Sequence, residues 1–320
     1  MYIMDSLAKL LKATSDPVRL LIIKILGLSS YGALELSYIL GLKQNSLSHH
    51  LKLLSQADII ESRREGNSIY YRRAIYSGDF QSLVEDVLAE TDRVALDTVQ
   101  VENILMIQQE REQQSKEFFS KNALRFKEQQ ELIADYESYS GVAHKMLISR
   151  GKAFNKAIEV GPGTGEFLLK LSQSYEQITA VDVSRDMLAQ AELFCSQQQL
   201  GNIEFIHGDQ DSLSASHQNA DAVIFNMVLH HVSNPAIEIR KAADLLKNDG
   251  LLLITDLSSH DQDWVRQSCG DLWLGFEETE LKQWAMSCGL VPLQTTHVGL
   301  RNGFQIQCQL FTKSSSFNEE

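Results

Sequence analysis

Short apolar runs alternate with helical stretches over the C-terminal half of this 320-residue chain, and this alternation constrains the fold more than any other feature. The runs begin after about residue 152 and read AIEV, ITAVDV, IEFI, AVIF and LLLITD. Apolar strands that alternate with helices predict a parallel sheet covered by helices on both faces. We therefore expect a Rossmann-like α/β domain over residues 151–314, with its ligand site at the carboxyl ends of the strands.

A glycine-rich turn, GPGTG, follows the first of these runs. It lacks the Gly-Lys-Ser/Thr ending of a phosphate-binding loop, and the last glycine of a dinucleotide fingerprint would fall on Glu166. The spacing that remains is E-x-G-x-G-x-G, made by Glu159, Gly161, Gly163 and Gly165. On a strand such as AIEV, this spacing resembles the first motif of class I S-adenosylmethionine (SAM) methyltransferases. The resemblance implies that the glycines and the Glu159 carboxylate lie near the aminoacyl arm of the ligand.

Polar residues at three later strand ends suit the same ligand. Asp182 closes ITAVDV, where its carboxylate is expected to accept both ribose hydroxyls, and Asp209 is expected to accept the adenine amino group. The remaining ligand-contacting residues expected here are Gln210, Asn226 and Met227. The resemblance covers about residues 155–312 and implies bound SAM or S-adenosylhomocysteine (SAH), with no metal.

Catalytic residues are not assigned by the sequence. Methyl transfer to a good nucleophile can proceed by proximity alone, whereas a weak nucleophile needs a general base. His230 and His231 follow the fourth apolar run and are candidates for that base, but they can equally make structural hydrogen bonds. Other polar candidates without a defining spacing are His260, Asp261, Asp263 and Asp271.

Residues 32–73 have the pattern of two helices followed by a β-hairpin. The first helix is expected to end at Gly41, and the second is expected to have Asn45 or Ser46 as its N-cap and to turn its leucines inward. Polar side chains at the start of such a helix meet base edges in the DNA major groove. The expected DNA-contacting residues on this helix are Gln44, Asn45, Ser46, Ser48, His49 and Lys52.

The hairpin, IIESRREGNSIYYRR, is expected to turn at Gly66 and Asn67 and to contact phosphates through arginine side chains. These are Arg63, Arg64, Arg72 and Arg73. Charge supports this assignment, because residues 1–74 hold ten basic and six acidic residues (+4), leaving 19 basic and 36 acidic residues elsewhere (−17). The alternative is that the arginines form an ordinary solvated surface.

The segment LAKLLKATSDPVRLLIIKIL, together with SHHLKLL and RREGNSIYYR, resembles the winged helix-turn-helix of the ArsR/SmtB transcriptional repressors over about residues 5–74. The resemblance implies a homodimer on palindromic double-stranded operator DNA. Metal sensing is not expected, because no cysteine precedes Cys195 and soft metals need thiolate or imidazole ligands. His50 is expected to pack or to bond to the backbone instead.

The sequence predicts three parts: a DNA-binding domain at 1–78, a helical linker with dimerisation and lid segments at 79–150, and the ligand domain at 151–314. A stripe of Val, Thr and Leu from about Phe80 to Gln114 predicts one helix that forms a subunit seam, or alternatively packs on its own domain. Aromatic residues expected either to close over the ligand or to pack in the core are Phe118, Phe119, Trp264, Trp273 and Phe276.

The sequence indicates a cytoplasmic protein. No apolar run approaches the roughly 20 residues of a membrane span, the N-terminus lacks a signal-peptide layout, and the four cysteines have no CxxC spacing.

Two functions remain open. The first function is a DNA-binding regulator, a repressor with SAM or SAH as effector, similar to SAH-responsive regulators of the methionine cycle. The second is an active methyltransferase of a small-molecule acceptor with a fused DNA-binding domain. We expect the first, because no acceptor-specific chemistry is legible.

Overall fold

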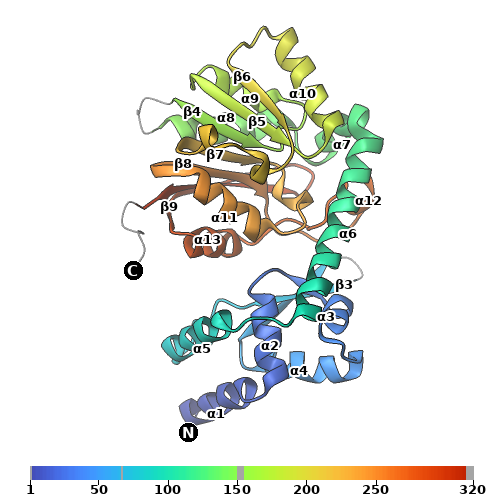
Figure 1. The fold of residues 1–320 in the computed structure, drawn as a ribbon, viewed down its shortest axis with the longest axis vertical. Helices are drawn as coiled ribbons and strands as arrows, with labels where there is room; N and C mark the ends of the chain where they lie inside the picture. Colours follow the sequence, from blue (N-terminus) through green and yellow to red (C-terminus); the bar gives the residue numbers. More distant parts are fainter. Residues whose placement is uncertain (1, 66–67, 150–154, 315–320) are drawn as a thin grey trace. The chain divides into compact units, whose positions relative to one another are not determined.

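The chain forms two compact units, Met1–Glu110 and Arg111–Glu320, each with its own buried core (Figure 1). The computed structural model describes residues 2–65, 68–149 and 155–314. The boundary expected at residue 150 and the hairpin turn expected at Gly66–Asn67 lie outside these residues. Within the described ranges, every helix is too short or too polar to span a bilayer.

The first unit is a helix-turn-helix with a small antiparallel sheet. Its elements are α1 (Tyr2–Thr14), α2 (Pro17–Leu26), β1 (Tyr31–Gly32), α3 (Ala33–Leu40), α4 (Gln44–Gln56), β2 (Ile60–Glu65), β3 (Ser68–Arg73), α5 (Gln81–Arg93) and the first half of α6 (Thr98–Asn122). The sheet order is β1-β3-β2, so β2 and β3 form the expected hairpin. Gly41 ends α3 with a left-handed φ of 62°, as predicted.

The N-cap of helix α4 lies two or three residues earlier than expected. Lys43 occupies the N-cap position without a side-chain hydrogen bond, so the assignment of Asn45 or Ser46 as N-cap was wrong. The helix is nonetheless amphipathic in the expected way, because its leucines are buried and its early polar residues are exposed. The buried residues are Leu47, Leu51 and Leu54.

The single helix predicted from about Phe80 to Gln114 is in fact two helices, α5 and α6. Asp97 accepts a hydrogen bond from the Gln100 N–H at 2.8 Å, and the Gln100 side chain accepts one from the Asp97 N–H at 3.2 Å. This reciprocal pair is a capping box, which starts a new helix. The predicted stripe is therefore divided: Val84 is buried in the unit's core, whereas Val94 is 64% exposed.

The second unit contains a seven-stranded sheet in the order β6-β5-β4-β7-β8-β10-β9. The strands are β4 (Lys156–Val160), β5 (Gln177–Asp182), β6 (Ile203–His207), β7 (Ala220–Asn226), β8 (Leu246–Leu257), β9 (Leu290–Gly299) and β10 (Gln305–Lys313). The first five in that order are parallel, and β10 pairs antiparallel with both β8 and β9. The expected parallel sheet and its closing antiparallel strands are thus present.

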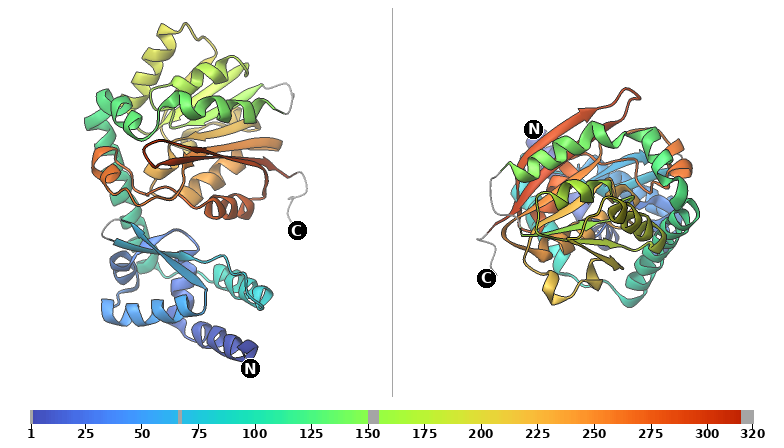
Figure 2. Two further views of the ribbon diagram at one scale, coloured as in Figure 1. Left: turned by 180° about the vertical axis from the view of Figure 1, so that it is seen from behind. Right: turned by 90° about the horizontal axis from the view of Figure 1, so that it is seen from above.

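Helices cover both faces of this sheet, with α8, α9 and α10 on one face and α11 and α13 on the other (Figures 1 and 2). The helices of this unit are the second half of α6, α7 (Phe126–Ile133), α8 (Tyr136–Ile148), α9 (Glu166–Ser172), α10 (Arg185–Gln197), α11 (Pro235–Leu245), α12 (Trp264–Ser268) and α13 (Glu278–Ser287). Short 3-10 turns are η1 (Ala123–Arg125), η2 (Gln210–Ser212), η3 (Ala215–His217) and η4 (Leu229–His231). This arrangement confirms the predicted α/β class.

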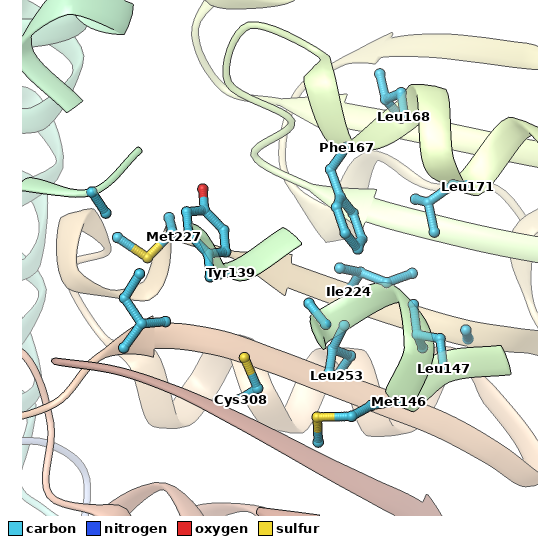
Figure 3. Packing of buried hydrophobic residues seen from close by; sticks show 14 of the residues in the cluster. Tyr139, Met146, Leu147, Phe167, Leu168, Leu171, Ile224, Met227, Leu253 and Cys308 are labelled. Carbon is cyan, nitrogen blue, oxygen red and sulfur yellow. The ribbon is translucent and has the colours of Figure 1, made fainter. Parts of the chain in front are cut away.

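Figure 3 shows the core between α8, α9 and the sheet. Phe167 of α9 packs with Ile224 of β7, and Leu147 of α8 lies on the same apolar cluster, each at most 1% exposed. Burying such a side chain contributes roughly 2–3 kcal/mol to folding. Because Phe167 and Leu168 come directly after the glycine turn, this packing fixes the turn against the sheet.

Candidate functional site

The glycine turn joins β4 to α9, and each of its three glycines has a left-handed φ: 67° at Gly161, 58° at Gly163 and 86° at Gly165. A Cβ at Gly161 would lie 2.3 Å from a methyl of Val228, and one at Gly165 would lie 3.0 Å from the Ala191 backbone. Packing therefore requires glycine at both positions. At Gly163 the nearest atom is a ring carbon of Phe126 at 3.6 Å, so this glycine borders open space.

A cavity of about 430 Å³ lies beside this turn, at the carboxyl ends of the parallel strands β4 to β7. Its size lies within the usual range for small-molecule sites. The structure brings together six of the expected ligand-contacting residues in its wall: Gly161, Gly163, Asp182, Asp209, Asn226 and Met227. Three others, Glu159, Gly165 and Gln210, do not line it.

Two polar groups near the turn lack partners within the described residues. The Asn226 side-chain oxygen has no hydrogen-bond partner there, although Asn226 lines the cavity. Glu159 lies behind the turn, 1% exposed, with Oε2 also lacking a partner. Burial raises the pKa of Glu159 well above its ordinary value. Of the two residues only Asn226 lines the cavity, so its oxygen is the one available to a hydrogen-bond donor of a ligand.

Asp182 closes β5 at the cavity wall, as expected for a group that accepts a ribose diol. Its Oδ1 accepts the Ser184 N–H at 2.8 Å. Burial raises the pKa of Asp182 to about 7, and the Ser184 hydrogen bond opposes this shift only in part. The ordinary pKa of this group is 3.8, so in the empty protein it titrates near neutrality.

Ligand affinity is expected to increase as the pH rises through about 7, because hydroxyl donors stabilise the ionised Asp182 carboxylate. Below pH 7 the ligand must displace a proton, so affinity falls by up to about tenfold per pH unit. Without ligand, the stability of the protein depends on pH in the opposite direction. Because the pKa of Asp182 is raised in the folded state, the free energy of unfolding falls as the pH rises from 3.8 to about 7. Calorimetric titration of SAH against pH checks this, and Asp182→Asn should weaken binding and flatten the curve. An unchanged slope in that variant would contradict it.

After the end of β6, Asp209 and Gln210 have protein partners in addition to the ligand contacts expected of them. Asp209 lines the cavity, but Lys241 of α11 lies 3.5 Å from its carboxylate and, despite the opposing effect of burial, holds the pKa of Asp209 below its ordinary value. Gln210 does not line the cavity, and its amide donates to the Glu238 carboxylate at 2.7 Å. The α11 residues Glu238 and Lys241 line the cavity as well, and no local motif indicated them.

Aromatic side chains cover the cavity from three helices. Phe119 of α6 lines it as expected of a lid, together with Phe126 of α7 and Tyr136 of α8, which the sequence analysis did not identify. The Lys127–Glu166 ion pair, at 2.6 Å, fastens α7 to α9. The other expected lid residues lie elsewhere: Phe118 against Gly270, Trp264 at the surface with 39% exposure, and Trp273 and Phe276 buried in the unit.

The two candidate catalytic histidines lie on η4, beneath and beside the cavity. His231 lines the cavity and contacts Phe119, with ring centroids 4.9 Å apart. His230 does not line it, and its Nδ1 lies 2.7 Å from Asp256 Oδ1. Burial alone would lower the pKa of His230, but the Asp256 and Asp271 carboxylates raise it to about 9. Burial and the cationic His230 lower the pKa of His231 well below its ordinary value.

The remaining candidates for a general base differ in how buried they are. His260 is partly buried beside Phe304, with its Nδ1 accepting the Gln262 N–H at 3.2 Å. Asp261 and Asp263 are exposed. Asp271 is 2% exposed and lies beside the two histidines.

In the first unit, the polar residues expected to meet base edges are all exposed on α4: Gln44, Asn45, Ser46, Ser48, His49 and Lys52. His50 is half-buried, with Nδ1 at 3.7 Å from Asp16 Oδ1. On the hairpin, Arg64 is exposed and Arg63 is partly buried.

Arg72 and Arg73 make ion pairs within the first unit, and these bonds would compete with the phosphate contacts expected of the two residues. Arg73 donates to both carboxylate oxygens of Asp92, at 2.8 and 2.6 Å, and to the Ile23 carbonyl at 2.8 Å. Arg72 donates to the Glu61 carboxylate at 2.6 Å. Because these guanidinium groups hold β3 to its neighbours, they are not available for phosphate without loss of those bonds.

Comparisons with known proteins agree with both units. Residues 126–306 match a family of methyltransferase domains, and residues 14–63 match a helix-turn-helix domain. The methyltransferase YcgJ of Bacillus subtilis is 27% identical over 138 residues, which is 43% of this chain and 53% of the relative. A methyltransferase of Geobacillus sp. is 32% identical over 139 residues, with coverage of 42% and 56%. The chain thus spans about half the length of these curated relatives.

Among solved structures, one is the 1,6-didemethyltoxoflavin-N1-methyltransferase of Burkholderia thailandensis with bound 1,6-didemethyltoxoflavin and SAH. It is 18% identical, has a TM-score of 0.53, and covers 65% of this chain and 91% of its own, which shows a shared fold. Since the methyltransferase-domain match extends over more than half of the sequence, this chain belongs to the methyltransferase-domain family and carries a helix-turn-helix domain before it.

Proposed function

We propose that the protein is a transcriptional repressor whose affinity for double-stranded operator DNA depends on SAM or SAH bound in the cavity of the second unit. The helix-turn-helix domain supports DNA binding and the methyltransferase domain supports SAM binding. A ligand can regulate only if it binds the DNA-competent and incompetent states with different affinities. SAH lacks the methyl group and the positive charge of SAM, so one site can distinguish them.

The observation that favours a sensor is that α6 belongs to both units. Ile104 and Ile107 lie in the core of the first unit, whereas Glu112, Lys116 and Phe119 line the cavity of the second. A ligand that contacts this second half therefore acts on the helix that completes the core of the DNA-binding unit. A methyltransferase that acted alone would not need such a helix.

The second half of α6 is held to its own unit beside the cavity. Arg111 donates to the Ser233 carbonyl at 3.3 Å and lies 5.0 Å from the Trp273 ring centroid. The Ser233 hydroxyl donates to Glu112 at 3.3 Å. Ser233 also lines the cavity, so these contacts join a ligand-facing wall to the helix.

The proposal assigns DNA binding to residues 1–78, a linking, dimerising and lid role to 79–150, and SAM or SAH binding to 151–314 in a cytoplasmic homodimer. Exposed apolar residues on α1 support self-association of the first unit: Ile3 is 60%, Met4 70% and Leu11 52% exposed. A two-fold dimer fits a palindromic operator.

The test is fluorescence anisotropy of the purified protein on its upstream DNA, titrated separately with SAM and with SAH. One ligand should shift the DNA-binding curve much more than the other. Calorimetry on the same samples verifies that both ligands bind. If both bind and neither shifts the DNA curve, the sensor function is wrong.

An active methyltransferase for a small-molecule acceptor is the second candidate, favoured by the position of His231 in the cavity wall next to Phe119. It predicts sustained methyl transfer from labelled SAM to an added acceptor. Turnover that His231→Gln abolishes, without loss of SAM binding, would rank this function first.

For DNA binding, Arg64→Ala should weaken affinity on every duplex sequence, because a phosphate contact does not read bases. The slope of log affinity against log salt concentration should fall by about 1. Arg93→Ala is the matched control, since Arg93 is exposed on α5 outside the hairpin. A loss restricted to one operator sequence would contradict the phosphate role.

A further inference from the structure

We propose that His230, His231 and Asp271 form a binding site for one divalent transition-metal ion, with Zn²⁺ or Co²⁺ as probe. The site adjoins the cavity through His231, which lines the cavity, whereas His230 and Asp271 do not line it and lie next to His231. This inference is independent of the regulatory function, and it differs from the absence of metal expected from the sequence.

The donor atoms are close enough to share one ion. One donor from each of the three residues lies within 4.8 Å of the others. His231 Nδ1 is 3.8 Å from Asp271 Oδ1, and it is hydrogen-bonded to the Gly270 carbonyl at 3.2 Å, a bond that a metal at Nδ1 would replace. Bonds of about 2.1 Å place two tetrahedral zinc ligands about 3.4 Å apart, slightly less than the His231–Asp271 separation.

Asp271 supplies a second observation that points to a ligand. Its side chain is fully buried and faces the charges of His230 and Arg266, yet neither carboxylate oxygen accepts a hydrogen bond within the described residues. Burying carboxylate oxygens without hydrogen bonds is costly. A bound metal ion would satisfy an oxygen that the protein leaves without a hydrogen bond.

His230 is already oriented as metal-binding histidines are. Asp256 Oδ1 lies 2.7 Å from its Nδ1, and Asp256 Oδ2 accepts the Leu229 N–H at 2.9 Å. A carboxylate that holds one ring nitrogen fixes the tautomer and leaves the other nitrogen for the metal. The 3-10 turn also brings the two rings together, with centroids 4.0 Å apart, although adjacent histidines on an α-helix would diverge.

The donor types select the class of ion. Two imidazoles and one carboxylate suit Zn²⁺ and neighbouring transition metals, whereas Mg²⁺ and Ca²⁺ prefer oxygen donors. Three protein ligands leave one coordination position for water or for a ligand atom. The site would therefore place a positive charge beside the cavity.

The test uses untagged full-length protein, stripped with a chelator and titrated with Co²⁺ and with Zn²⁺ against a chromophoric chelator. One equivalent per chain should bind, and Co²⁺ should show the intense visible absorption of four-coordinate geometry. Asp271→Asn should weaken Zn²⁺ binding by at least about tenfold, since even outer-shell changes cost about 10- to 100-fold. Asp261→Asn, which changes an exposed carboxylate, is the control and should bind like the parent protein.

Metal uptake by the parent protein tests the proposed site even if the Asp271→Asn variant does not fold. Uptake well below one equivalent, or pale six-coordinate Co²⁺, would overturn the proposal. Equal Zn²⁺ affinity in the parent protein and a folded Asp271→Asn variant would also overturn it. Folding of each variant is verified by circular dichroism.

Discussion

Replacing Gly163 by arginine is expected to abolish SAM and SAH binding while both units remain folded. A Cβ at this position meets only a ring carbon of Phe126 at 3.6 Å, so the substitution has room at the backbone. The left-handed φ of 58° costs roughly 1–2 kcal/mol in a non-glycine residue. The long cationic side chain then fills the ligand space beside Asp182 and Asn226. We expect calorimetry to show a loss of affinity of at least about 100-fold, equivalent to about 2.7 kcal/mol.

Gly201→Arg is the matched control for this substitution. A Cβ there has nothing within 4 Å, and Gly201 does not line the cavity. Its SAH affinity should equal that of the parent protein. If Gly163→Arg binds SAH normally, the cavity is not the ligand site, and if it unfolds, the position assigned to this glycine at the cavity wall is wrong.

Arg73→Ala is expected to reduce the stability of the first unit by about 2–3 kcal/mol, the usual effect of breaking charge-assisted hydrogen bonds that are partly shielded from water. The Arg73 side chain is 12% exposed, and it joins β3 to Asp92 of α5 and to the Ile23 carbonyl of α2. Its Asp92 partner is about half exposed, which limits the loss through solvent screening. Urea unfolding followed by circular dichroism measures the change.

Arg64→Ala serves as the comparison, because Arg64 is exposed on the neighbouring strand and should change stability by less than about 0.5 kcal/mol. The two variants thus separate the structural and DNA-binding roles of the hairpin arginines. If Arg73→Ala retained full stability but lost DNA affinity, Arg73 would act mainly as a phosphate contact.

The centre of the sheet could be predicted because β4, β5, β7 and β8 contain buried apolar runs, so their signal is local. The glycine turn could also be predicted, because only glycine fits at Gly161 and Gly165. Both have a left-handed φ, and Val228 and Ala191 lie too close for a side chain. The break between α5 and α6 also had a local signal, the Asp97-x-x-Gln100 capping box. It was missed because the hydrophobic spacing continued across it.

Other parts of the site depend on partners far along the chain. Gln210 is held by Glu238, 28 residues later, which accepts a hydrogen bond from its amide. Arg73 is held by Asp92, 19 residues later. Asp271 reaches the histidines of η4 only through the loop that follows α12. No spacing rule in the sequence indicates such pairings, since the packing of helices and loops determines them.

The strand order of the second unit determines which of the two units can fold first during synthesis. Strand β10 is made after β8 and β9 but lies between them, so the sheet cannot close until residues 305–313 have left the ribosome. The core of the first unit uses residues up to Ile107 and needs none of the later chain. A nascent or truncated product that lacks β10 would therefore have a folded DNA-binding unit and no ligand-binding unit. Under the proposed function, such a product would occupy DNA without responding to the ligand.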